Sequence, residues 1–129
     1  MNVAIICTSL LALLLFGLGF SISMKRGRSE GAGGYPQDQA DPLFKRIRAH
    51  ANTAEYAPMF AVLFLFIGAQ NPAAWVVWTI VIATVCRYLI VAGILLSPTL
   101  AKPHPLRLIG ALGTYITGVV LALVGFSMN

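Results

Sequence analysis

The stretch Arg46–Phe60, with the sequence RIRAHANTAEYAPMF, decides the fold, because it leads polar and charged side chains straight into an apolar run that continues to Ala69. On an α-helix, Arg48, Asn52 and Glu55 stand at i, i+4 and i+7 and therefore project from one face. Ionisable groups inside a membrane are costly and usually mark a functional site. We expect this polar stripe to be the functional centre of a membrane protein, and a purely structural network between helices is the alternative.

The composition excludes an ordinary soluble globule. The chain has 129 residues, of which 58% are hydrophobic and 10% charged, and its mean hydropathy is +0.82. A helix needs about 20 mostly apolar residues to cross a hydrocarbon core of ~30 Å. Runs of this kind predict four helices, at about residues 2–24, 42–70, 73–96 and 106–127. We predict a single all-α domain over residues 1–129, an integral membrane four-helix bundle.

Local signals mark the helix boundaries. Asp41 followed by proline is a typical helix start, and Asn71-Pro72 repeats this signal before the third helix. Pro58 should kink the second helix. The connection between Lys25 and Gln39 is rich in glycine, serine and charge, which is typical of a flexible loop.

Two arginines stand in or beside the later helices. Arg87 lies well inside the third helix, and Glu55 is its natural counter-charge, because it is the only acidic residue within a predicted span. Arg107 opens the fourth helix, where its simplest interpretation is an anchor at the membrane interface. His104 stands alone between prolines, so we expect a solvated loop residue and no metal site.

Small residues predict close packing between helices. Gly17 and Gly19 in the first helix are expected to lie where a neighbouring helix comes close. Gly110, Thr114 and Gly118 recur every four residues in the fourth helix. This ridge indicates close contact within the chain or between subunits.

The charge pattern predicts orientation and ligand class. The net charge is +5, yet no continuous basic surface interleaved with aromatic residues is present, so we expect no nucleic-acid partner. The basic loops 25–45 and 102–107 fall on one side of a four-span topology, and the positive-inside rule places both in the cytoplasm and both termini outside. We expect a bacterial inner membrane. Arg48 and Arg107 then share one interface, where they could bind one small anionic ligand.

The polar stripe also carries a resemblance. Arg48-x-x-x-Asn52-x-x-Glu55-Tyr56-x-Pro58 resembles the MAPEG family, the membrane-associated proteins in eicosanoid and glutathione metabolism. The Asn-x-x-Glu-Tyr-x-Pro part looks like the leukotriene C4 synthase branch, and Arg48-Ala49-His50 looks like the prostaglandin E synthase branch. An arginine inside the third helix and Leu106-Arg107-Leu108 at the start of the fourth also match.

The resemblance implies a homotrimer that binds glutathione, as co-substrate, between adjacent subunits near the cytoplasmic face. Arg107 matches the catalytic arginine that favours the glutathione thiolate. Lys25 or Arg26 could contact a glutathione carboxylate. The residues that would bind glutathione are Arg26, Arg48, Asn52, Glu55, Tyr56 and Arg87.

The resemblance favours a glutathione transferase, or a peroxidase, that detoxifies lipophilic electrophiles arriving from the lipid bilayer. Ala51, Ile90 and Ile94 replace polar or aromatic residues of the eicosanoid enzymes, which argues against an eicosanoid-specific role. A small transporter, or a non-catalytic protein whose polar residues serve assembly, is the alternative. The absence of charge inside the first helix argues against a four-helix exporter.

Overall fold

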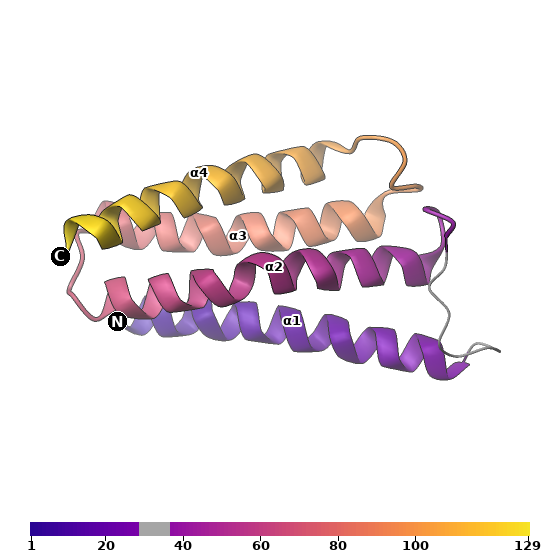
Figure 1. The fold of residues 1–129 in the computed structure, drawn as a ribbon, viewed down its shortest axis with the longest axis horizontal. Coiled ribbons are helices and arrows are strands. Elements are labelled where there is room, and N and C mark those ends of the chain that lie inside the picture. The colour runs from indigo at the N-terminus through magenta and orange to yellow at the C-terminus, as the bar shows by residue number, and fades with distance from the viewer. Residues whose placement is uncertain (29–36) are drawn as a thin grey trace.

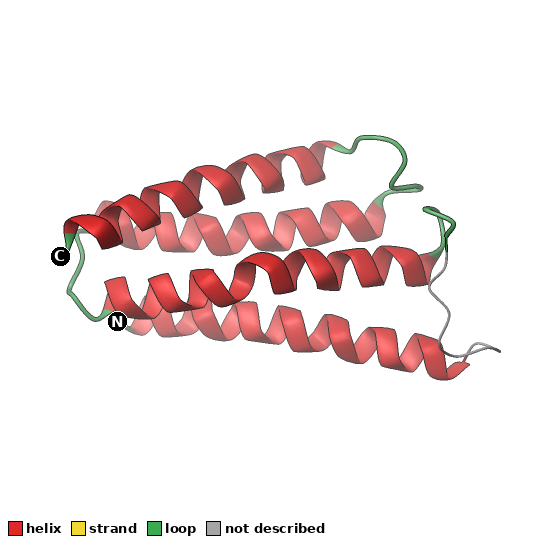
Figure 2. Ribbon diagram, viewed as in Figure 1, coloured by secondary structure: helices red, strands yellow, loops and turns green. Residues whose placement is uncertain are grey.

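The structure is a computed structural model that describes residues 1–28 and 37–129. Within these residues the chain forms four long helices. Figure 2 shows them packed lengthwise, with loops in the described parts of the connections. They are α1 (Asn2–Arg28), α2 (Pro42–Gly68), α3 (Ala74–Leu96) and α4 (Pro105–Ser127). Each is long and apolar enough to cross a membrane. The prediction of an all-α four-helix bundle is confirmed.

The helices run alternately up and down. Figure 1 shows both termini and the α2–α3 turn at one end of the bundle, and the end of α1, the start of α2 and the α3–α4 connection at the other. The most extensive contacts join α1 to α2 and α3 to α4, so the bundle consists of two helical hairpins. The described parts of the two basic segments therefore lie at one end, which we call the loop end.

The signal at Asp41 produces the expected helix start. The Asp41 carboxylate accepts hydrogen bonds from the backbone N–H groups of Leu43, at 2.7 Å, and Phe44, at 3.4 Å. These bonds satisfy N–H groups that have no partner within a first helical turn. Pro42 occupies the first helical position, where its missing N–H costs nothing.

Two boundaries differ from the prediction. The N-cap of α3 is Ala73, without a side-chain hydrogen bond, and Asn71 lies in the preceding turn with φ of 51°. Asparagine tolerates this left-handed conformation, so the residue serves the turn and not the cap. The first helix reaches Arg28, beyond its predicted end near residue 24. The centre of the predicted glycine-rich loop, residues 29–36, lies outside the described residues.

Two apolar clusters fill the bundle, at successive levels along its long axis. The cluster nearer the termini includes Phe60, Phe64 and Ile80. The cluster nearer the loop end includes Ala49 and Ile90. Along each of α2, α3 and α4, buried or half-buried polar side chains separate the two clusters. These side chains are Asn52, Arg87 and Thr114, which we call the polar layer.

Glycines allow α3 and α4 to pack closely. A Cβ atom added to Gly110 would lie 2.6 Å from the backbone nitrogen of Ile90, and one added to Gly113 would overlap the Cys86 sulfur. The small-residue ridge of α4 is therefore used within the chain. A Cβ atom on Gly19 would meet His50 at 3.3 Å, but one on Gly17 would meet nothing within 4 Å. Within the described part of the chain, no neighbouring helix packs against Gly17, and its face of α1 is open.

We expect Gly110→Ala to lower the free energy of unfolding in detergent by about 1–3 kcal/mol, the usual cost of overpacking. The new methyl group would meet backbone atoms of α3, which cannot rotate away. Gly17→Ala is the matched control and should be neutral or slightly stabilising, since alanine favours a helix over glycine. Thermal unfolding of the purified variants measures both. Equal stability of Gly110→Ala and the parent protein would contradict the close packing.

Candidate functional site

The Arg87 guanidinium lies at the centre of the polar layer and is completely buried, with 0% of the residue exposed. Nη1 donates to the Thr114 hydroxyl at 3.3 Å, and Nη2 donates to the side-chain oxygen of Asn52. The guanidinium also stacks 5.0 Å from the centre of the Tyr56 ring. Arg87 thus joins α3 to α2 and α4 by neutral partners.

The predicted pairing of Arg87 with Glu55 is not observed. Glu55 is exposed on α2, and among the described residues no ion pair involves either side chain. Asn52 stands one turn earlier on α2, nearer the side of the helix that faces α3, and its oxygen takes the position expected for the carboxylate. A neutral amide and a hydroxyl therefore hold the buried cation.

A cavity of about 350 Å³ opens beside the polar layer at the loop end. Arg48 and Asn52 of α2 and Arg107 of α4 line it, so the structure brings together the two arginines expected to share an anionic ligand. Its lining contains no acidic side chain. Ile90 and Ile94 form an apolar wall, as their replacement of polar residues predicted. We call this space the cationic cavity; its volume lies within the range of small-molecule sites.

Arg107 and His104 belong to both the cavity and the α3–α4 connection. Nη1 of Arg107 donates to the backbone carbonyls of Leu100, at 3.3 Å, and Lys102, at 3.1 Å. The Nδ1 atom of His104 accepts the N–H of Leu106 at 3.2 Å and so caps α4. We predicted a solvated loop residue, but His104 is a half-buried helix cap. These contacts hold the guanidinium of Arg107 at the cavity.

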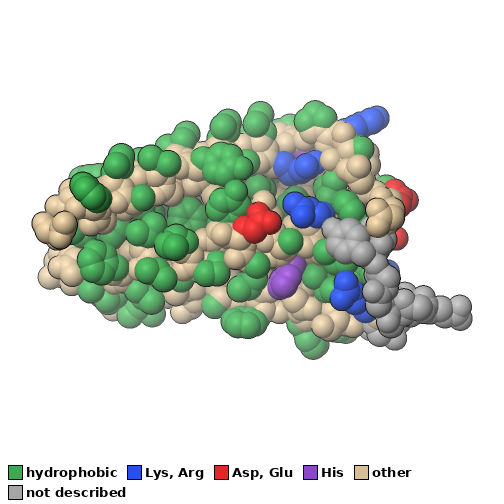
Figure 3. All heavy atoms as spheres, in the orientation of Figure 1, with side chains coloured by type: hydrophobic (Ala, Val, Ile, Leu, Met, Phe, Trp, Pro, Cys, Tyr) green, Lys and Arg blue, Asp and Glu red, His purple; other side chains and the backbone are tan. Residues whose placement is uncertain are grey.

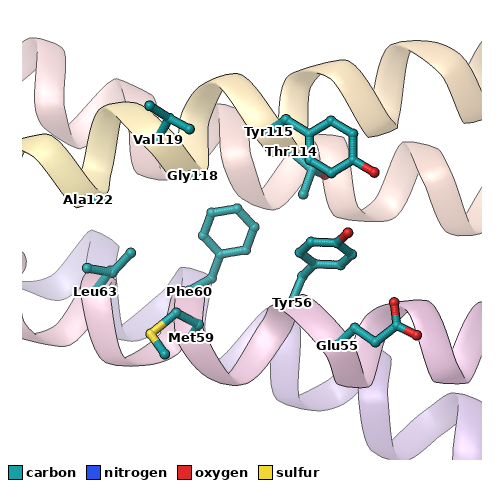
Figure 4. Close-up of a pocket in the computed structure, with 10 residues that line it drawn as sticks. All are labelled: Glu55, Tyr56, Met59, Phe60, Leu63, Thr114, Tyr115, Gly118, Val119 and Ala122. Atoms are coloured by element: carbon teal, nitrogen blue, oxygen red, sulfur yellow. The ribbon is translucent and has the colours of Figure 1, made fainter.

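A second cavity, of about 490 Å³, lies between α2 and α4. Figure 4 shows Tyr56 and Phe60 of α2 pointing toward α4, with Tyr115 of α4 facing Tyr56. The two tyrosine rings lie 6.0 Å apart, centre to centre, at 60° to each other. Apart from Glu55, Thr114 and the tyrosine hydroxyls, the lining is apolar, so we call this space the apolar cavity. Tyr115 lines both cavities and marks their junction.

The remaining predicted site residues are dispersed. Tyr56 and Glu55 line the apolar cavity and not the cationic one. Arg26 lies half-buried near the end of α1 and lines neither. Figure 3 shows charged side chains gathered toward the loop end, with hydrophobic side chains covering the rest of this face. Sequence reasoning missed Tyr115; its position two turns beyond Arg107 on α4 was the available signal.

The family model named MAPEG family matches residues 4–127, nearly the whole chain. The chain belongs to the MAPEG family. This family of membrane proteins includes glutathione transferases and generally uses glutathione. Together with the four span-length helices, membership makes the chain a multi-pass integral membrane protein. Comparisons with curated proteins and with solved structures found no match.

We expect Asn52→Leu to destabilise the MAPEG fold by about 1–3 kcal/mol, because it leaves a buried N–H of Arg87 without an acceptor. Asn52→Asp is the matched variant. It keeps an oxygen at the same place and adds the missing counter-charge, so its thermal unfolding in detergent should be close to that of the parent. Equal losses in both variants would show that the amide, and not the acceptor oxygen, matters.

Proposed function

We propose that this protein is a glutathione-dependent membrane transferase that joins the glutathione sulfur to lipophilic electrophiles. One observation carries the proposal: a cavity lined by two arginines adjoins an apolar cavity within the span of α2 and α4, and the two meet at Tyr115. A water-soluble anion and a membrane-soluble partner can thus approach each other from opposite sides. Membership in the family supports glutathione as the anion.

The lining of the cationic cavity suits glutathione. Glutathione carries two carboxylates, one ammonium and one thiol, and the planar fork of an arginine matches a carboxylate by two parallel hydrogen bonds. Arg48 and Arg107 stand on different walls of the cavity, so Arg48 can take one carboxylate and leave Arg107 free to face the sulfur. Asn52 adds an amide between them and the polar layer.

Arg107 would supply the chemistry by stabilising negative charge on the sulfur. A nearby guanidinium lowers the pKa of a thiol, and the thiolate is the nucleophile. The proton leaves to water. The sulfur electron pair forms a bond to the electrophilic carbon, and the bond to the leaving group breaks with its electron pair. Holding both reactants at the junction of the cavities supplies proximity. With a hydroperoxide, the thiolate would attack the outer peroxide oxygen and break the O–O bond to release an alcohol. A second glutathione would then convert the resulting sulfenic acid to glutathione disulfide and water.

Glu55 and Arg26 would contribute to the proposed glutathione site only in an assembled homotrimer. Within one chain neither lines the cationic cavity. In a homotrimer with glutathione between adjacent subunits, Glu55 would take the glutathione ammonium and Arg26 of the next subunit a carboxylate. The loop end would face the cytoplasm of a bacterium, where glutathione is dissolved, with both termini on the other side of the inner membrane.

We expect Arg107→Ala to lower conjugation of glutathione to an aryl halide at pH 7 by tenfold or more. Removing the guanidinium raises the thiol pKa, so activity in the variant should recover toward higher pH, with a tenfold loss for each pKa unit. The rate of conjugation against pH, measured on detergent-purified protein, tests this. Lys102→Ala removes a cation from the same connection that does not line the cavity, and should leave the profile unchanged.

The same experiment distinguishes the transferase from a non-catalytic protein. That role has a specific observation in its favour, because both recorded hydrogen bonds of Arg107 go to carbonyls of the α3–α4 connection. If Arg107→Ala breaks up the oligomer, or if the parent protein neither conjugates glutathione nor gains thermal stability from it, the transferase proposal is wrong.

We expect Val119→Trp to raise the KM for a lipophilic electrophile severalfold and to leave the KM for glutathione unchanged. Val119 lines the apolar cavity, and an indole there would occupy space needed by the electrophile. Leu123→Trp is the matched control, since Leu123 is exposed on the same helix but does not line the cavity. Steady-state kinetics with each substrate varied in turn separates the two effects. Equal changes in both variants would place the electrophile elsewhere.

A further inference from the structure

A third cavity, also of about 350 Å³, lies between α1 and α2 at the loop end. Its lining is Phe20, Ser21, Met24, Lys25 and Arg46. It shares no lining residue with the cationic cavity or the apolar cavity, so it is a separate feature of the molecule. We call it the α1–α2 cavity.

The α1–α2 cavity is suited to an anion with several oxygen atoms. Nη1 of Arg46 donates to the Ser21 carbonyl at 3.1 Å, which fixes the guanidinium at the wall. A guanidinium has five N–H groups, so donors remain for a ligand. Lys25 adds a second cation. Within residues 1–28 and 37–129, the structure records no ion pair that would neutralise either side chain.

An apolar path leads from the cavity along α1. Leu13, Phe16 and Phe20 are strongly exposed, at 68%, 74% and 68%, and lie on one helical face. Gly17 lies on the same face, and a Cβ atom there would meet nothing within 4 Å. The missing side chain leaves a shallow notch between the large ones. A hydrocarbon chain laid along this face would therefore run over Gly17 toward the middle of the span.

The cavity also lies at the depth of a lipid headgroup. Lys25 stands 23 residues after Asn2 on a continuous helix, a distance of ~35 Å at 1.5 Å per residue. That length carries it across the hydrocarbon core of ~30 Å to the far interface. Basic pockets between helices at this depth bind anionic lipid headgroups.

We propose that the α1–α2 cavity binds the phosphate of an anionic phospholipid, with one acyl chain lying over Gly17. Charge complementarity selects the phosphate, and the apolar Phe20 and Met24 beside the two cations select a lipid over a free ion. A second copy of the chain would cover the apolar face but would leave the cations without an anion. The α1–α2 cavity shares no lining residue with the two cavities of the transferase proposal, although Lys25 is also a candidate contact for a glutathione carboxylate.

The test is native mass spectrometry of the detergent-purified protein with phosphatidylglycerol or phosphatidylcholine of identical acyl chains. We expect preferential retention of phosphatidylglycerol. Lys25→Gln and Arg46→Gln should each reduce it about fivefold, the factor that corresponds to roughly 1 kcal/mol per cation. Lys25 is exposed, so its variant should fold even if that of Arg46 does not. Lys102→Gln, at the same end but outside the cavity, is the matched control and should retain the lipid.

Two further experiments distinguish a phospholipid from free phosphate in the cavity, and a lipid from a second copy of the chain on the exposed face of α1. Gly17→Leu should weaken lipid retention without loss of thermal stability, because the leucine fills the notch, and millimolar inorganic phosphate should not displace the lipid. Equal retention of both lipids, an equal loss in Lys102→Gln, or displacement by inorganic phosphate would each overturn the proposal. Dissociation of the oligomer by Gly17→Leu would assign the face to a second copy and overturn it as well.

Discussion

The buried guanidinium of Arg87 is the constraint on which the rest of this bundle depends. A cation enclosed by three helices in a membrane protein is tolerated only if its N–H groups find acceptors, since an unmet charge in a low-dielectric interior is very costly. Acceptors from α2 and α4 meet Nη2 and Nη1, the Tyr56 ring covers the guanidinium face, and Nε has no hydrogen-bond partner within the described residues. The register of three helices against one another is thereby specified at one level of the bundle. Asn52, which holds Arg87 and also lines the cationic cavity, transmits this constraint to the site.

Close packing of α3 and α4 makes that arrangement possible. Gly110 touches the backbone of α3, and its carbonyl accepts the hydroxyl of Thr114 at 2.7 Å. The same hydroxyl accepts from Arg87. A larger residue at position 110 would push α4 outward and lengthen the bond to the buried cation. The small-residue ridge and the polar layer therefore act as one unit, in which van der Waals contact sets the distance over which the hydrogen bond forms.

The three cavities of the bundle differ in their position along the helices and in their linings. The cationic cavity and the α1–α2 cavity both lie at the loop end and differ in their linings. The first has an aliphatic wall of α3 and α4 beside its arginines, whereas the second borders an open apolar face of α1. The apolar cavity lies deeper, between α2 and α4. Soluble anion, lipid and lipophilic partner could thus occupy the protein together.

The sequence by itself determined the membrane class, four helices with alternating direction, the cap at Asp41, the common end of the basic loops and the meeting of Arg48 with Arg107. These follow from local or one-dimensional quantities: apolar run length, helical period, cap chemistry and charge order. Only the tertiary structure decided that Asn52 and Thr114, not Glu55, hold Arg87, that Gly17 faces open space while Gly110 touches α3, and that Tyr115 joins two cavities. Each of these depends on how far and at what rotation one helix lies against another. Helix rotation and spacing arise from packing of all the side chains together, and no single helix carries that information in its own pattern.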